Sequence, residues 1–454
     1  MNNILEKQRT FFMTGQTLDI EFRISYLKKL ANEIKKREND ILNALYKDLG
    51  KSETEAYMCE LGLTLSEISY FLKNLKTFAK EKTVPTPLTN FMSRSYIKFV
   101  PRGNVLIISP WNYPFLLSVE PLVDAIAAGN TVILKPSAYS PYTSDVIFEI
   151  INSVFEDEYV KVVKGGREEN KNLLNLNFDF VFFTGSQNVG KEVLRSCSEN
   201  LTPSVLELGG KSPCIVDKTA NIKLAAKRIV FGKFLNCGQT CVAPDYIYCD
   251  KSVKEELISE LIAQIDKQYG NKPILNKDYG KIINKKHFER LINLIDQNRV
   301  IKGGNTSEET LKIEPTIMAP VTWNDKVMQE EIFGPVLPIL EYDNLNDVIK
   351  EINNHANPLA LYIFSNNKKN IKSVTDLCRY GGGCINDVVV HLATSEMPFG
   401  GFKESGMGAY HGKYGFETFS HQKSMLDKKV WIDLPIRYQP YNAFCMKLLK
   451  IFLK

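Results

Sequence analysis

The 454-residue sequence lacks the marks of a membrane or secreted protein. It contains no run of about 18 consecutive apolar residues, so no transmembrane segment is predicted. Its first residues, MNNILEKQRTFF, hold no basic stretch followed by an apolar run, so no secretory signal is expected. Its nine cysteines are spread without the dense, regular spacing of a disulfide scaffold. We therefore expect a cytoplasmic protein with reduced thiols.

Strong charge and clustered metal ligands are also missing. Lys and Arg total 57 and Asp and Glu total 52, and the net charge of +5 is not gathered in one basic block, so nucleic-acid binding is not indicated. The five histidines are scattered singly and the C-x-x-x-C of NCGQTC has no partner pair, so no metal site is predicted. What is present, 44% hydrophobic residues, is typical of a globular protein of two or three domains.

Alternating strands and helices dominate the chain. Residues 1–80 carry apolar side chains at helical spacing, and the proline-rich residues 81–99 predict an extended arm or hairpin. Short β-branched or aromatic runs, separated by helices, then follow at 105–109, 131–135, 159–163, 178–184 and 204–208. A second alternating series begins after Gly210. This order predicts the α/β fold class, with two domains built on parallel sheets.

The turn TGSQNVGKE, residues 184–192, is a candidate phosphate site because it joins a predicted strand to a predicted helix. Its glycines and lysine are close to a P-loop, which would indicate nucleotide hydrolysis. However, Glu192 stands where a P-loop needs a hydroxyl for Mg²⁺, and the G-x-G-x-x-G of the common dinucleotide fold is absent. The alternative is a tight turn with only a connecting role.

Three polar residues follow or end predicted strands, where open α/β sheets bind ligands. Asn112 of SPWNYP could donate to an oxyanion or cap its own backbone. Lys135 could reach a ribose or phosphate, or remain in solvent. Glu207, between two leucines and followed by two glycines, could be a general base with a raised pKa or a surface acid.

The stretch FLNCGQTC raises the question of which cysteine does chemistry. Cys237 is predicted in the last turn of a helix capped by Gly238, with its side chain packed. Cys241 follows the glycine in irregular chain, where the backbone N–H of a nucleophile is free to face a carbonyl. The alternative for either residue is a small buried hydrophobe.

Two later segments are further candidates. In MQEEIFGPVLP, Glu331 could bind ribose hydroxyls and Phe333 could pack on a flat heterocycle, or the segment could be a strand lead-in with solvated acids. The glycine-rich residues 397–421 indicate a mobile loop near a site or an interface arm.

Five motifs in this order resemble those of the aldehyde dehydrogenase family: PWNYP, ELGGKSP, NCGQTC, EEIFGPV and PFGGFKESGMG. The similarity runs from about Leu42 to Tyr441, and GGGCINDVVVH and HGKYGFETFSH are similar to its class-three branch. It implies the aldehyde dehydrogenase fold, in which two Rossmann-like parallel α/β domains are joined by a β oligomerisation arm. The implied parts are an NAD(P)-binding domain at 1–80 and 100–207, a catalytic domain at 208–407, and an arm and C-terminal tail at 81–99 and 408–454.

The resemblance implies NAD(P)-dependent oxidation of medium- or long-chain aliphatic or aromatic aldehydes to carboxylic acids, with hydrolysis of a thioester. Cys241 would be the nucleophile, Glu207 the base that activates water, and Asn112 with the Cys241 N–H the oxyanion hole. The implied cofactor contacts are Lys135, Gly185, Ser186, Gly190, Trp111, Leu208, Glu331 and Phe333. His411 matches a class-three position without a defined role.

One departure bears on the cofactor. Many relatives carry a glutamate three residues after Lys135, where it repels a 2′-phosphate, but here the residue is Ala138. We therefore expect use of both NAD and NADP. The branch also implies a homodimer, and the basic amphipathic end, YNAFCMKLLKIFLK, is expected to pack on protein, with peripheral membrane contact as the alternative.

Rival functions are weakened by the same residues. Glu207 argues against relatives that transfer the acyl group to coenzyme A, and Cys241, Glu207 and Asn112 together argue against a non-catalytic scaffold. A cofactor-independent thiol esterase activity remains open as a side reaction.

Overall fold

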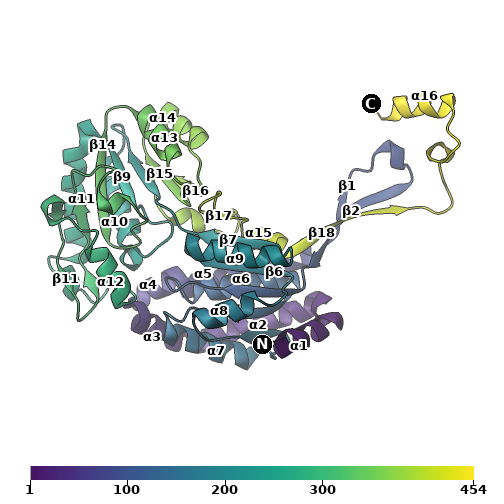
Figure 1. The fold of residues 1–454 in the computed structure, drawn as a ribbon, viewed down its shortest axis with the longest axis horizontal. Helices are drawn as coiled ribbons and strands as arrows, with labels where there is room; N and C mark the ends of the chain where they lie inside the picture. The colour runs from purple at the N-terminus through teal and green to yellow at the C-terminus, as the bar shows by residue number, and fades with distance from the viewer. Residues whose placement is uncertain (1, 454) are drawn as a thin grey trace.

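A computed structural model describes residues 2–453 as two α/β bodies and a projecting arm (Figure 1). Met1 and Lys454, the end residues of the first and last predicted segments, lie outside the described residues. The two bodies contain separate, mainly parallel sheets of six and seven strands. The predicted fold class, with two parallel α/β domains and a β arm, is therefore confirmed.

The first body is built on a sheet of order β17-β7-β6-β3-β4-β5. All of its pairs are parallel except that of β17 with β7. Every residue of β3 and of β4 is buried, as expected for a parallel sheet that is covered on both faces. The strands are β3 (Asn104–Ile108), β4 (Thr131–Lys135), β5 (Val160–Val162), β6 (Phe180–Gly185), β7 (Ser204–Leu208) and β17 (Gly406–Met407).

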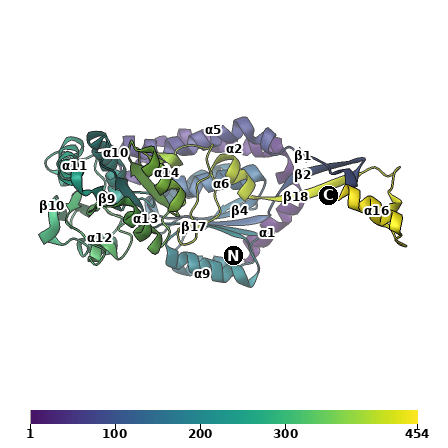
Figure 2. The ribbon, with the colours of Figure 1, turned by 90° about the horizontal axis from the view of Figure 1, so that it is seen from above.

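Helices cover both faces of this sheet (Figure 2). The face that carries α1, α8 and α9 forms one apolar cluster, and the opposite face packs on α2, α5, α6 and α7. The helices are α1 (Asn2–Met13), α2 (Ile20–Lys36), α3 (Glu38–Leu49), α4 (Glu53–Ala56), α5 (Gly62–Phe78), α6 (Leu116–Ala128), α7 (Pro141–Val154), α8 (Arg167–Leu174), α9 (Gln187–Glu199) and α15 (Gly412–Thr418).

The second body has a sheet of order β10-β13-β14-β9-β8-β15-β16, in which only the pair of β10 and β13 is antiparallel. Helices α10 and α11 cover one face and α12, α13 and α14 the other. Its strands are β8 (Pro213–Val216), β9 (Tyr246–Asp250), β10 (Val300–Lys302), β13 (Thr316–Met318), β14 (Val336–Tyr342), β15 (Ala360–Phe364) and β16 (Gly382–Ile385), with a small hairpin of β11 (Thr306–Ser307) and β12 (Lys312–Ile313). Its helices are α10 (Ile222–Phe234), α11 (Lys254–Tyr269), α12 (Lys285–Ile292), α13 (Leu345–Asn354) and α14 (Lys368–Leu377).

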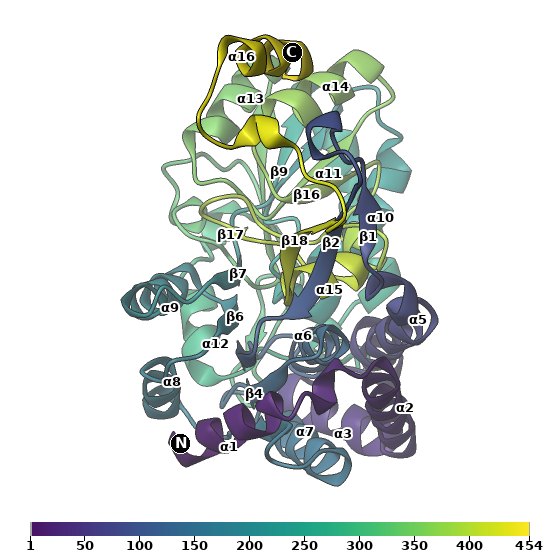
Figure 3. The ribbon, with the colours of Figure 1, turned by 90° about the vertical axis from the view of Figure 1, so that its right-hand side faces the viewer.

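The arm is a three-stranded antiparallel sheet of order β1-β2-β18 that extends away from both bodies (Figures 1 and 2), and Figure 3 shows it from the side of its free end. It consists of β1 (Lys82–Val84), β2 (Ser93–Pro101) and β18 (Ser420–Lys428), followed by α16 (Ala443–Phe452). Within the predicted segment 408–454, α15 instead packs on α5 and α6 of the first body. The chain therefore enters the arm only at Ser420.

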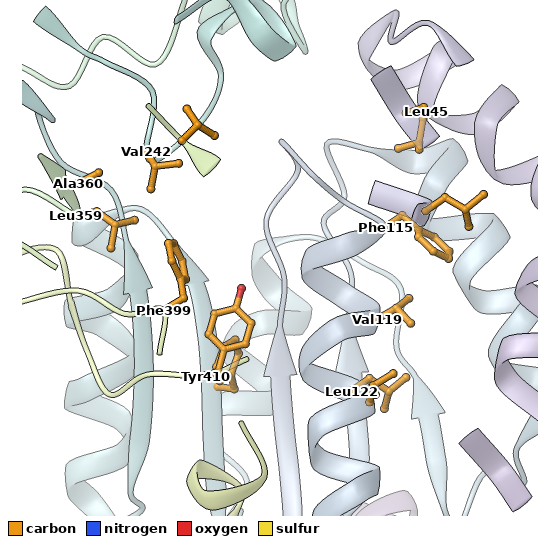
Figure 4. Packing of buried hydrophobic residues seen from close by; sticks show 14 of the residues in the cluster. Leu45, Phe115, Val119, Leu122, Val242, Leu359, Ala360, Phe399 and Tyr410 are labelled. Carbon is orange, nitrogen blue, oxygen red and sulfur yellow. The ribbon is translucent and has the colours of Figure 1, made fainter. Parts of the chain in front are cut away.

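One apolar cluster links the two bodies (Figure 4). It runs from Val242 and Leu359 in the second body, past Phe399 and Tyr410, to Val119 on α6. This continuity holds the facing ends of the two sheets in fixed positions, because close-packed interiors deform little. Across residues 2–453, no helix has both the length and the apolar character needed to cross a membrane.

Candidate functional site

Two cavities meet at Cys241. The larger, of about 570 Å³, lies between the two bodies and is lined by the carboxyl ends of β6 and β7 and by the turn after β3. The smaller, of about 190 Å³, is lined mainly by apolar side chains. Cys241 and Leu117 line both cavities. A compound bound to the Cys241 sulfur can therefore extend into one cavity while a second ligand occupies the other.

The chain before Cys241 departs from the predicted helix. Cys237 was expected in the last helical turn, but α10 ends at Phe234 and a short 3₁₀ turn, η4 (Leu235–Gly238), follows. Asn236 and Cys237 have φ angles of 51° and 53°, in the left-handed region that non-glycine residues rarely adopt. The predicted helical position of Cys237 was wrong because tertiary contacts hold these residues outside the helical region, whereas its packed side chain is confirmed.

Gly238 completes the reversal of the chain. Its φ is 73°, and a Cβ at this position would overlap the backbone carbonyl of Gly334. Glycine is required here for two reasons: the φ angle is left-handed, and the backbone at Gly334 comes too close for a side chain. The reversal separates the two cysteines: Cys237 is buried in the core of the second body, whereas Cys241 is partly exposed in the cavities.

The Cys241 thiol is held in its neutral form in the free protein. Burial raises the pKa of this thiol to about 12, and the neighbouring Glu331 and Glu207 carboxyl groups also raise it. Only the thiolate is a strong nucleophile, so a base or a positive charge must act before this sulfur reacts.

Glu207 is the last but one residue of β7 and lines the larger cavity. It is 2% exposed, and neither side-chain oxygen has a hydrogen-bond partner among the described residues. Burial raises the pKa of Glu207 well above its usual range. The backbone next to Glu207 is held by β17 and the loop before it, because the Leu208 N–H donates to the Ser405 carbonyl at 3.0 Å. A buried acid with free oxygens is suited to take a proton from water or from a thiol.

Asn112 lies in the turn between β3 and α6 and is 3% exposed. Its Nδ2 donates to the Gln239 carbonyl at 3.0 Å, which ties it to the turn that leads to Cys241. An amide nitrogen carries two hydrogens, so one remains for a ligand in the larger cavity that Asn112 lines. Asn112, Glu207 and Cys241, which are distant in sequence, thus line one cavity.

Aromatic and acidic side chains line the rest of the larger cavity. The rings of Trp111 and Phe333 pack edge to face with centroids 5.4 Å apart, and Leu208 lies in the same lining. Glu331 lies beside them, and burial raises the pKa of its carboxyl group to about 8. These groups offer flat apolar surface next to a hydrogen-bond acceptor, which suits a heterocycle attached to a sugar.

The remaining predicted cofactor residues differ in their access to the cavity. Gly185 and Ser186 line it at the start of α9, and the Ser186 hydroxyl caps no helical N–H among the described residues. Gly190 lies one turn further along, where a Cβ would come within 2.8 Å of Leu208, so its absence of a side chain lets α9 approach β7. Lys135 is 2% exposed and donates to the Pro136 carbonyl at 2.8 Å, and burial lowers the pKa of its ammonium group to about 8.

The smaller cavity has an apolar wall and one polar end. Leu63, Phe231 and Phe399 contribute to the wall, and Glu120 and His411 form part of the polar end. His411 Nε2 lies 3.5 Å from the Glu120 carboxylate. Burial lowers the pKa of His411 to about 3, so its ring is neutral near pH 7.

Lys51 and Glu60, which belong to none of the quoted motifs, and Asn236 of NCGQTC also support the site. Lys51 donates to the Asn112 carbonyl, Asn236 donates to the same carbonyl, and Glu60 pairs with Lys51. Sequence reasoning missed Lys51 and Glu60 because a charged residue in a helical region ordinarily lies in solvent. Lys51 lies in the loop between α3 and α4 and Glu60 in the turn Tyr57–Leu61, so neither belongs to a regular helical pattern in the sequence.

Comparisons with known proteins agree over the length of the chain. A sequence model described as the aldehyde dehydrogenase family matches residues 2–425. The 4,4'-diaponeurosporen-aldehyde dehydrogenase of Staphylococcus aureus is 50% identical over 458 residues, covering 100% of both chains. A Mus musculus protein named aldehyde dehydrogenase, dimeric NADP-preferring, is 44% identical over 426 residues, covering 94% of each chain. The solved structure titled "Substrate bound state of Staphylococcus Aureus AldH" has a TM-score of 0.98 at 49% identity, covering 100% of this chain and 99% of that one.

Proposed function

The chain belongs to the aldehyde dehydrogenase family, enzymes that oxidise aldehydes to acids, and from that premise we propose that it oxidises medium- or long-chain aliphatic or aromatic aldehydes through a thioester on Cys241. The resemblance of its five motifs to that family is thereby confirmed. The position of Cys241 at the junction of a polar and an apolar cavity is the observation that supports the proposal most directly.

The first step is attack of the Cys241 sulfur on the aldehyde carbon. The thiol gives its proton to solvent as the thiolate forms, and Glu207, which lines the same cavity with two unpartnered oxygens, stays free for the later step. The free hydrogen of the Asn112 amide and the Cys241 N–H donate to the oxygen that becomes negative in the thiohemiacetal. When bound, the oxidised nicotinamide cofactor supplies the hydride acceptor. Loss of hydride from the carbon leaves a thioester on Cys241.

Glu207 then acts on water. Burial raises its pKa well above the usual range, so it is a stronger base than an ordinary carboxylate. Proton removal allows the water oxygen to attack the thioester carbon, the C–S bond breaks, and the carboxylic acid leaves with Cys241 restored. Asn112 stabilises the oxyanion in this step as well.

The larger cavity fits a dinucleotide cofactor. The start of α9 at Ser186 suits the pyrophosphate, Glu331 suits the nicotinamide ribose, and Trp111, Leu208 and Phe333 suit the ring. We assign Gly185 to the same turn and Gly190 to the packing of α9 on β7 that keeps the turn in place. Lys135 would contact the adenosine ribose by turning from the Pro136 carbonyl.

Both NAD and NADP are proposed as cofactors. Ala138 provides no negative charge against a 2′-phosphate, and the mouse relative is named NADP-preferring. Steady-state kinetics with each cofactor test this proposal. A preference for NAD of about a thousandfold or more in kcat/KM would contradict it, since that corresponds to about 4 kcal/mol of discrimination.

The nucleophile is tested with a matched pair of cysteine variants. Hexanal and benzaldehyde are supplied with NAD, and formation of the reduced cofactor is followed by absorbance. Cys241→Ser is expected to lower kcat by about 10⁴ or more, as loss of a covalent nucleophile does, whereas Cys237→Ser retains turnover because Cys237 lies in a separate core. Equal activity of parent and Cys241→Ser would refute the assignment.

We also propose a cytoplasmic homodimer. All nine cysteines are free thiols, which is typical of proteins in a reducing compartment. The projecting arm and the name of the dimeric mouse relative support pairing of two copies. We favour packing of α16 on protein. Contact with a membrane surface is the alternative, because the helix carries lysines beside apolar side chains.

A further inference from the structure

A buried ion pair contacts the backbone of Asn112. Lys51 follows α3, and its Nζ lies 2.5 Å from Glu60 Oε1, with both side chains fully excluded from solvent. The same Nζ donates to the Asn112 carbonyl at 3.0 Å and lies 4.0 Å from the centre of the Tyr113 ring. One ammonium group therefore holds an acid, a backbone carbonyl and an aromatic face together.

Glu60 holds the other end of the same turn. It lies in a single π-helical turn, η2 (Tyr57–Leu61). Such turns are rare in proteins, and those that occur are often found at functional sites. Its Oε2 accepts the N–H groups of Phe115 at 2.8 Å and Leu116 at 3.2 Å. These groups begin α6 and have no helical carbonyl to bind, so the carboxylate satisfies them and matches the positive end of the helix.

A neighbouring acid holds the turn that leads to Cys241. Glu55 Oε1 accepts the Asn236 N–H at 2.8 Å, where the backbone is left-handed. The Asn236 amide in turn donates to the Asn112 carbonyl at 2.7 Å and to the Gln239 carbonyl at 3.1 Å. The segment between α3 and α5 thus contacts both the turn that holds Asn112 and the turn that leads to Cys241, the two parts of the proposed oxyanion hole.

We propose that Lys51 and Glu60 are positioning residues that hold the Asn112 amide in place for oxyanion stabilisation. Their assignment depends on the proposed role of Asn112. Between them they bind the Asn112 carbonyl and the first two N–H groups after the turn, so they fix the backbone that directly follows the Asn112 side chain. A displacement of about 1 Å in such a donor is sufficient to cost roughly 10²-fold in rate.

Stability alone does not account for this pair. Two ions buried without solvent lose much of their mutual attraction to desolvation, and replacing both by uncharged groups is often neutral for stability. Removing one partner is far more costly, because it leaves an unpaired buried charge. If the pair serves only stability, replacing both partners should restore activity together with stability. If it positions Asn112, activity should stay low after stability has recovered.

The test compares Lys51→Met, Glu60→Gln and the double variant Lys51→Met/Glu60→Gln. Each single change is expected to lower both Tm and kcat. The double variant is expected to recover most of the Tm while its kcat for hexanal remains about 10–100-fold below the parent, with KM changed less than about threefold. A double variant with parental kcat overturns the proposal.

A second measurement asks whether the pair acts through Asn112. In an Asn112→Ala background, adding the double change is expected to lower kcat less than about twofold further, because effects on one shared interaction are not additive. A full 10–100-fold further loss overturns the positioning role. The partly exposed pair Lys302 and Asp266, at 2.5 Å in the second body, gives a control away from the site, and Lys302→Met/Asp266→Asn is expected to retain parental kcat.

Different results would refute the oxyanion role of Asn112 and the positioning role of Lys51 and Glu60. If Asn112→Ala alone has parental kcat, the oxyanion role of Asn112 is refuted, and the inference on Lys51 and Glu60 falls with it. If Asn112→Ala is impaired but Lys51→Met/Glu60→Gln is not, only the positioning inference is refuted.

Discussion

At the scale of single residues, the reactivity of Cys241 depends on where its proton goes. Because burial and two nearby acids raise the pKa of this thiol to about 12, the free protein holds little thiolate near neutral pH. We predict that iodoacetamide alkylates Cys241 slowly at about pH 7 and faster as the pH rises toward about 12, since the thiolate is the reactive form. Addition of NAD, which carries a cationic ring, is expected to accelerate alkylation.

Peptide mapping by mass spectrometry measures this rate separately for Cys241 and for the other cysteines. Cys384, which is also partly exposed and has a raised thiol pKa, gives an internal comparison that NAD is not expected to affect. A rate at Cys241 that is independent of pH between about 7 and 10 would contradict the raised pKa.

Glu207 is predicted to matter most after the cofactor has been reduced. Glu207→Gln keeps the shape of the side chain but removes the base, so the thioester should accumulate. We expect a burst of about one reduced cofactor per Cys241, followed by a steady-state kcat lowered by roughly 10²–10⁴. Stopped-flow absorbance separates the burst from the slow phase.

The exposed strand residue Glu341 provides the control for this experiment. Glu341→Gln removes the same charge from a residue paired with Lys254 on the surface, and it should retain parental kcat. If Glu207→Gln turns over at the parental rate, the role assigned to Glu207 is incorrect.

At the scale of elements, α5 and α6 meet the segment before α15 at a group of buried acids. Glu67 on α5 accepts the Ser395 hydroxyl and the Gly412 N–H, each at 2.5 Å, and lies near Asp124 on α6, whose two oxygens have no hydrogen-bond partner among the described residues. Burial and the neighbouring Glu67 and Glu120 raise the pKa of Asp124 well above its usual range. Asp124 is therefore expected to be protonated.

This contact should make stability depend on pH in a defined direction. A carboxyl group with a raised folded-state pKa contributes its full stability below its unfolded-state pKa of about 4 and loses it as the pH rises through the folded-state pKa. Asp124→Asn cannot ionise. We predict that its Tm relative to the parent increases by about 2–4 °C between about pH 5 and pH 9.

Calorimetry at several pH values measures the difference. The exposed Asp343 gives the control, since Asp343→Asn should shift Tm equally at each pH. His411 faces the same group, but both parent and variant contain it, so its titration cancels in the comparison. A constant difference for Asp124→Asn would show that Asp124 is ionised in the folded protein.

The elements themselves differed in how well the sequence predicted them. The five runs of the first sheet were predicted because buried parallel strands are continuously apolar, and Cys241, Glu207 and Asn112 stood out because each lies in a distinctive motif beside such a strand or turn. The end of α10 was not predicted, because its left-handed residues are held by contacts such as that between Glu55 and Asn236, 181 residues apart in sequence. The Lys51–Asn112 contact spans 61 residues and leaves no local pattern.

At the scale of the whole molecule, the arm exposes apolar surface that a single copy does not cover. Trp431 is 68% exposed and Phe444 is 68% exposed, and Met425 and Leu426 are exposed on β18. Within residues 2–453, β18 pairs only with β2, so its outer edge has free backbone groups. Exposed apolar side chains beside an open strand edge are typical of an interface with another chain.

We therefore predict that the protein sediments as a dimer and that Trp431→Asp/Phe444→Asp weakens the dimer by about tenfold or more in Kd. Burying two carboxylates in an apolar interface costs free energy unless each finds a partner, and about 1.4 kcal/mol already gives a tenfold change. Sedimentation velocity over a range of concentrations measures the shift. Leu275, 72% exposed on the second body, gives the control, because Leu275→Asp adds charge away from the arm and should leave the dimer unchanged. A parent protein that remains monomeric at all concentrations would mean that the arm serves a different partner.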